Sequence, residues 1–262
     1  MPLPLHIKET FDSFSPVALE EMDNVRLMNR VDTKYVLSVK KLPELLTRIN
    51  GEYRILEVNK NRLLSYDTIY LDTIDRIFYN QHVLGKPERN KVRFRKYEST
   101  GITFLEVKKK TRKNRTIKWR IENNLSDNNI CDQKAMEFIK EHIQGDLPVL
   151  KPVLTSRFNR ITLVGSVVKE RITIDYDLSY ADREGNQRAL PSLAIIEVKR
   201  ETFSAGSPFA VILKDCLIRP TGFSKYCVGT AFLYDLPRKN ILKPKLLLIN
   251  KIENEFNRHF IS

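Results

Sequence analysis

The chain has 262 residues, of which 42% are hydrophobic, so it can bury one substantial core and we expect a single domain. Its 45 Lys and Arg against 32 Asp and Glu give a formal charge of +13, which predicts an anionic partner: nucleic acid, an acidic membrane surface, or a polyphosphate or nucleotide. Three cysteines without metal-ligand spacing and four scattered histidines argue against a zinc site or a histidine-based triad.

We expect neither an N-terminal secretory signal nor a membrane-spanning segment in this chain. The N-terminus lacks the apolar region of a secretory signal, and no run approaches the ~18 apolar residues of a membrane span. Near the C-terminus, KPKLLLINKIENEF has charges at nearly helical spacing and predicts an amphipathic helix that packs on the core. We therefore expect a cytoplasmic protein.

The predicted elements alternate between strands and short helices. Helical patterns occur at 16–28, 40–49, 74–85, 133–143 and in two pieces within 208–233. Strand patterns occur at 30–38, 63–73, 91–97, 103–110, 115–123, 150–164, 169–182 and 193–201. Short connections such as ESTG, which predicts a hairpin, dominate the middle of the chain, so an antiparallel sheet flanked by helices is expected.

Charged residues alternate with apolar residues along these strands. In KVRFRKY, Arg93 and Arg95 share one face while Val92 and Phe94 share the other, because successive side chains of a strand point to opposite faces. Five further strands repeat this design. A single strand of this kind is ordinarily half-buried with its charges in water, but the repetition suggests one common charged surface.

Two architectures can use such strands: an open sheet with its charged face in water, or a barrel with the charges inside and helices outside. Cations ~4 Å apart repel by about 4 kcal/mol at an effective dielectric near 20, so an enclosed ring of cations needs an anionic occupant. A narrow tunnel admits a chain of phosphates rather than duplex nucleic acid. The carboxylates of Glu106, Asp175 and Glu197 can form ion pairs, which we favour, or hold a divalent metal.

The segments RVDTKYVL, KVRFRKY, FLEVK, RTIKW, SRFNR, ERITIDYDL, IIEVK and GFSKY occur in an order that resembles the VTC (vacuolar transporter chaperone) polyphosphate polymerase domain. This domain belongs to the triphosphate tunnel metalloenzyme (CYTH-like) superfamily. The resemblance implies an α+β fold with a closed antiparallel eight-stranded β-barrel flanked by helices. It implies one domain over 1–262, with a core at about 20–234 and a helical extension at 235–262. It also implies transfer of the γ-phosphoryl group of ATP to polyphosphate, assisted by Mn²⁺ or Mg²⁺.

The resemblance assigns roles to individual residues. Glu197 matches the metal-binding glutamate, and Lys225 in FSKY matches a catalytic lysine that reaches the tunnel. The implied phosphate ligands are Lys34, Arg93, Arg95, Lys108, Lys118, Arg160 and Arg171. The alternative for each of these cations is a solvated surface charge.

Three departures keep the activity open. Arg30, Asp32 and Lys34 replace the Glu-x-Glu-x-Lys of the hydrolytic branch, and Gly222 and Lys110 replace a basic residue and a histidine of the fungal polymerase pattern. The alternatives are a triphosphatase acting on inorganic or nucleoside triphosphate, or a non-catalytic polyphosphate-binding or sensor module. The expected partners are ATP and polyphosphate or triphosphate. Nucleic acid is not expected, and the sequence is silent on a membrane partner protein.

Overall fold

The computed structural model of the chain describes residues 5–25, 30–113, 115–123, 132–143, 145, 148–201 and 206–258. Residues 26–28 of the expected entry helix, and also Cys131 and His259, lie outside this part. Within it, the helix α7 (Lys243–Arg258) is the longest, and no described helix combines the length and apolar character needed to cross a membrane.

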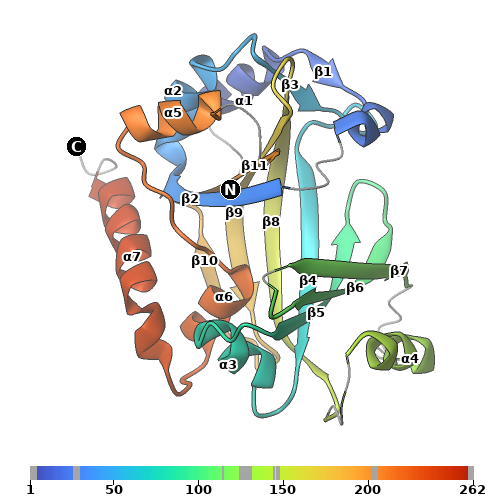
Figure 1. The fold of residues 1–262 in the computed structure, drawn as a ribbon. Helices are drawn as coiled ribbons and strands as arrows, with labels where there is room; N and C mark the ends of the chain where they lie inside the picture. Colours follow the sequence, from blue (N-terminus) through green and yellow to red (C-terminus); the bar gives the residue numbers. More distant parts are fainter. Residues whose placement is uncertain are drawn as a thin grey trace.

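Strands contain more residues of the described chain than helices do (Figure 1). They are β1 (Pro16–Val17), β2 (Arg30–Ser38), β3 (Tyr53–Leu56), β4 (Leu64–Asp72), β5 (Arg89–Tyr97), β6 (Thr103–Lys110), β7 (Thr116–Glu122), β8 (Lys151–Gly165), β9 (Glu170–Ala181), β10 (Gln187–Leu190) and β11 (Leu193–Glu201). All eight predicted strands are confirmed. β1, β3 and β10 were not predicted.

The helices are short apart from α7. They are α1 (Leu5–Asp12), α2 (Leu42–Thr47), α3 (Ile77–Val83), α4 (Gln133–His142), α5 (Pro208–Asp215) and α6 (Lys225–Leu233), with 3₁₀ turns η1 (Glu20–Val25), η2 (Val39–Lys41) and η3 (Lys239–Leu242). The prediction of one helix over 16–28 was wrong at its start, because Pro16 and Val17 pair in parallel with Ile55 and Leu56.

The main sheet follows the order β2-β11-β9-β8-β4-β5-β6-β7, and each neighbouring pair is antiparallel. The sheet curls into a half-barrel. In the described residues β2 and β7 do not pair with each other, so the expected closed barrel was wrong and the barrel is open. Openness keeps the edge cations Arg30 and Arg120 apart and in contact with water, whereas closure would bring like charges together.

The convex side of the sheet is apolar and covered by helices. Side chains from β2, β8, β9 and β11, including Ile161 and Ile196, form one buried cluster with Phe11 of α1, Leu45 of α2 and Phe209 of α5. Figure 1 shows these three helices at one end of the sheet and α4 beside β6 and β7. The helices therefore cover the apolar faces that the strand alternation predicted.

The helix α6 packs on the concave side instead. Tyr226 stacks on Tyr70 of β4 with ring centroids 5.1 Å apart, and its hydroxyl donates to buried Asp72. A Cβ at Gly229 would lie 2.4 Å from the ring of Tyr180 and 2.8 Å from Leu154, so this close approach requires glycine. α6 thus closes one end of the concave side and presents its N-terminus to the charged strands.

Candidate functional site

All seven predicted phosphate ligands, together with Glu197, lie on the concave face. Directly paired residues of an antiparallel ladder point to the same face of the sheet. The register pairs Lys34 with Glu197, Arg93 with Glu106, Lys108 with Lys118, Arg160 with Asp175, and Arg171 with Lys199. We call this set, with Arg95, Lys225, Lys91 and Asp32, the basic trough.

Glu106 is the centre of the first ion cluster in the basic trough. Its side chain is only 1% exposed, and its Oε2 lies 2.6 Å from Arg93 Nη2 and 4.0 Å from Arg95 Nη1. Lys118 Nζ donates to Oε1. Burial alone would raise the pKa of this carboxyl, but Arg93, Arg95 and Lys118 together hold that pKa well below its usual range. Glu106 is therefore an ionised counter-charge.

Asp175 is the centre of the second cluster, where α6 meets the sheet. Arg160 donates to both carboxylate oxygens, at 2.5 and 2.8 Å, and Lys225 Nζ donates to Oδ2. Burial would raise the pKa of Asp175, yet Arg160 and Lys225 lower it to about 2. Lys225 reaches this position because it is the first residue of α6, which Ser224 caps by accepting from Cys227 N–H at 3.3 Å.

Glu197 is the centre of the third cluster. Its Oε1 lies 2.5 Å from Lys34 Nζ, and its Oε2 lies 2.7 Å from Lys199 Nζ. Lys199 also donates to Asp32 at 2.9 Å. Burial raises the pKa of Glu197, but Lys199 and Lys34 outweigh this effect and hold it well below its usual range. The ion pairs that we favoured for the three carboxylates are therefore confirmed.

Three residues of the basic trough were missed as site candidates. Lys91 donates to Ser224 Oγ at 3.4 Å, and Lys199 and Asp32 join the Glu197 cluster. The alternation could have found them, since Lys91 continues the Arg93 face, Lys199 continues the Glu197 face and Asp32 continues the Lys34 face. Burial, followed by the effect of nearby Arg93, lowers the pKa of Lys91 to about 8.

Two polar atoms of the basic trough, and one of Thr173, which pairs with Glu197 in the strand ladder, have no hydrogen-bond partner in the described part of the chain. Arg95 Nε, Arg171 Nε and Thr173 Oγ1 are buried and make no hydrogen bond within the described residues. Buried donors are nearly always paired in proteins, because an unsatisfied one costs about 1 to 3 kcal/mol. These atoms lie on a face where basic side chains outnumber acidic ones, so an anion with several oxygen acceptors would satisfy them.

The basic trough offers little to a metal on its own. Among the described residues, no group of three or more His, Cys, Asp or Glu side chains is placed to hold an ion. Glu197 and Asp32, both in contact with Lys199, are carboxylates of the hard-oxygen type that Mg²⁺ and Mn²⁺ accept. The residues fit a metal that takes one or two carboxylates and completes its coordination with phosphate oxygens.

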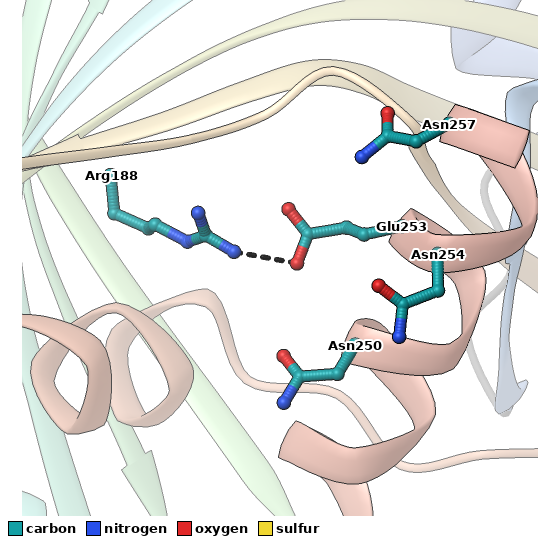
Figure 2. Close-up of a pocket in the computed structure, with 5 residues that line it drawn as sticks. All are labelled: Arg188, Asn250, Glu253, Asn254 and Asn257. Carbon is teal, nitrogen blue, oxygen red and sulfur yellow. Dashed lines mark hydrogen bonds and ion pairs between the residues drawn. The ribbon is translucent and has the colours of Figure 1, made fainter. Parts of the chain in front are cut away.

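A separate hollow lies between β10 and α7, away from the basic trough. Figure 2 shows Arg188 entering it from the strand and meeting Glu253 of α7, with an N–O distance of 2.5 Å. Three asparagines, Asn250, Asn254 and Asn257, complete the lining of this hollow of about 340 Å³. Arg188, the cation in this lining, is paired with Glu253, so the hollow lacks the surplus of positive charge found in the basic trough. No residue predicted as a site residue lines the hollow.

The curled antiparallel sheet forms an open half-barrel whose concave face carries more basic than acidic side chains. The sequence model of the VTC domain family matches residues 29–234, so the chain belongs to the VTC domain family and the resemblance is confirmed. The match includes every predicted site residue.

Solved structures that match this chain do so at low sequence identity and with TM-scores below 0.5. A candidate adenylate cyclase from Vibrio parahaemolyticus is 14% identical with a TM-score of 0.46, covering 78% of this chain and 99% of that one. A candidate adenylyl cyclase from Hippeastrum with a dominant triphosphatase activity is 14% identical with a TM-score of 0.42, covering 81% and 99%. No curated protein matches the sequence.

Proposed function

We propose that this chain is a metal-dependent polyphosphate polymerase, which transfers the γ-phosphoryl group of ATP to a polyphosphate chain held in the basic trough. The observation that carries the proposal is a set of buried donors that find no hydrogen-bond partner among the described residues and lie among surplus cations: Arg95 Nε, Arg171 Nε and Thr173 Oγ1. A phosphate chain supplies acceptor oxygens and negative charge in one ligand. Membership of the VTC domain family supports the same substrate class.

The phosphate ligands in this proposal are the seven cations predicted from the sequence. Arg93, Arg95 and Lys118 surround Glu106 on one side of the half-barrel, while Arg160 and Arg171 lie on β8 and β9. Lys34 and Lys108 lie near opposite ends of the strand order, on β2 and β6. A chain that crosses between them would contact cations from both halves of the sheet, and each charge-assisted contact contributes about 1.5 to 3 kcal/mol.

Lys225 is the proposed catalytic residue. Its ammonium is placed at the start of α6, where the backbone N–H groups also favour negative charge. In the reaction an oxygen of the acceptor chain forms a bond to the γ-phosphorus, and the bond from that phosphorus to the bridging oxygen of ADP breaks. Lys225 would neutralise negative charge on the transferred group and on the leaving ADP.

Glu197, with Asp32 beside it, would hold the divalent ion, Mn²⁺ or Mg²⁺. When bound, the ion supplies charge neutralisation at the phosphate oxygens. The chain's own residues bind and orient the triphosphate, and no covalent nucleophile is required, because phosphoryl transfer depends largely on positioning and charge. The proposed catalytic domain is the single unit expected from the sequence, with the core at about 20–234 and α7 within the extension.

The test is incubation of the pure protein with ATP and Mn²⁺, followed by gel separation of polyphosphate and a parallel assay of free phosphate. Polymer that disappears in Lys225→Ala but persists in Lys214→Ala supports the proposal. Lys214 is a matched control because it is an exposed lysine of α5 on the convex side. Orthophosphate without polymer would make the chain a triphosphatase, and tight polyphosphate binding without either product would make it a binding module.

A further inference from the structure

A lysine fills the space between the two carboxylates nearest the proposed metal position. Lys199 Nζ lies 2.9 Å from Asp32 Oδ2 and 2.7 Å from Glu197 Oε2. The strand register produces this arrangement, because Lys199 on β11 is paired directly with Asp32 on β2, and Glu197 is two residues away on the same face. A single ammonium group therefore bridges both carboxylates.

The surroundings of Lys199 hold it in this position. The residue is only 8% exposed, so its charge depends on these carboxylates rather than on water. The second oxygen of Glu197 is also engaged, since Oε1 lies 2.5 Å from Lys34 Nζ. Both oxygens of Glu197 thus contact lysines, and a divalent ion would have to displace at least one of them.

The ammonium group of Lys199 and a divalent metal ion would compete for the same carboxylate oxygens. Carboxylate oxygens are ligands for Mg²⁺ and Mn²⁺, and an ammonium group between them occupies the place of such an ion. A doubly charged ion beside Lys34 and Lys199 would also be repelled by both charges.

We propose that Lys199 acts as a resident cation between Asp32 and Glu197, so that the ligand-free protein excludes divalent metal and accepts it only together with a phosphate chain. The proposal rests on the metal-binding role proposed for Glu197. A bound phosphate chain would draw Lys34 and Lys199 towards its own oxygens and would add ligands to the ion. In this scheme Lys199 determines the order of binding, because the metal ion binds only when the phosphate chain does.

The test is titration of Mn²⁺ into protein free of ATP and polyphosphate, followed by electron paramagnetic resonance of the unbound ion. We expect weak binding to the wild type and at least tenfold tighter binding to Lys199→Met, in which the two carboxylates lose their bridging cation. Adding Asp32→Asn to Lys199→Met should return the affinity to the wild-type level. Lys169→Met is the matched control, since it removes one exposed lysine, 3.7 Å from Glu201, and leaves Asp32 and Glu197 unchanged.

Equal Mn²⁺ affinity in the wild type and Lys199→Met would overturn the proposal, as would an equal gain in Lys169→Met. Tight binding that survives Asp32→Asn would also overturn it, because Glu197 alone would then hold the ion. Lys199→Gln, which keeps a hydrogen-bond donor, replaces Lys199→Met if circular dichroism shows that the latter is unfolded. The titration contains no phosphate substrate, so its outcome is separate from whether the protein makes polymer.

Discussion

Lys225 and Asp175 join α6 to the sheet through a hydrogen-bonded ion pair, in which the lysine ammonium donates to a carboxylate that Arg160 also contacts. Asp175 is 4% exposed, so the pair is held away from water. An anionic ligand that binds Lys225 and Arg160 would therefore compete with the carboxylate of Asp175.

Replacing Asp175 with Asn should therefore change binding and stability in opposite directions. The isosteric amide removes a negative charge beside Lys225 and Arg160, so we expect roughly tenfold tighter binding of tripolyphosphate by isothermal titration. Without added ligand, the variant should lose about 3 to 5 kcal/mol of unfolding free energy, because two half-buried cations lose their buried partner. Weaker tripolyphosphate binding would show instead that Asp175 is needed to orient Arg160.

Lys225→Ala should reduce turnover more than affinity. The remaining cations of the basic trough still bind the ground state, but one contact to the transferring group is lost. The measurement is initial rate against ATP concentration at saturating Mn²⁺, beside a direct binding titration. An unchanged kcat would remove the catalytic role, and equal losses of rate and binding would make Lys225 an ordinary phosphate ligand.

Glu106→Gln should destabilise the ligand-free protein and make it dependent on phosphate. Arg93, Arg95 and Lys118 would then share no counter-charge, and breaking such a buried cluster costs about 3 to 5 kcal/mol. We expect a lower Tm that rises with added tripolyphosphate by more than the wild-type Tm does. A similar ligand-induced rise in both proteins would place the anion away from this cluster.

Gly229→Ala should displace α6 without removing any charged group. The new methyl group would overlap the buried ring of Tyr180, and overpacking of this kind costs about 1 to 3 kcal/mol. Because Lys225 lies one turn away on the same helix, turnover should fall while tripolyphosphate affinity changes little. Gly222→Ala is the matched control, since a Cβ there meets no atom within 4 Å. Equal activity in Gly229→Ala and the wild type would show that displacement of α6 does not affect the position of Lys225 in the reaction.

The protein should take up protons when it binds a phosphate ligand at pH 8. Burial and neighbouring cations lower the pKa of Lys91 to about 8 and that of Lys108 to about 7, so both lysines are partly neutral in the free protein at this pH. A bound anion favours their charged forms, and affinity should therefore fall as the pH rises from about 7 to 9. Phosphate groups with a second pKa near 6 are already ionised there and contribute little.

Calorimetry in two buffers of different ionisation enthalpy measures this proton uptake. Lys91→Met should reduce the uptake, and Lys214→Met should leave it unchanged. Binding with no proton uptake at pH 8 would mean that neither lysine contacts the ligand.

The strands and their charged faces could be predicted from local pattern. Period-two alternation identified the segments around Arg93, Lys108 and Glu197, and the structure places those side chains on one face. Alternation is a property of each strand separately, so it cannot distinguish an open sheet from a closed one. The pairing of Pro16 with Ile55 depends on residues far apart in the chain, and the local pattern contains no sign of it.

The contacts of the basic trough were harder to predict than its composition. That Lys199 bridges Asp32 and Glu197 depends on the register between β2 and β11, and a shift of one residue would have moved Lys199 to the other face. The contact between Lys225 and Asp175 also depends on long-range packing. It forms because α6 packs closely against the sheet at Gly229. Residue types therefore indicated the chemistry of the site, while long-range packing decided the partners.

In the described residues β2 and β7 do not pair with each other, and under the proposed function this openness determines how a long polymer would enter the molecule. A closed ring must be threaded from a free end, and the time this takes grows with the length of the polymer. No β2–β7 ladder closes the half-barrel of the described chain, so an interior stretch of polyphosphate could be laid into it without threading. A cyclic or end-blocked polyphosphate would then be held as readily as a linear one, and capture would depend on the number of phosphates present rather than on the number of ends.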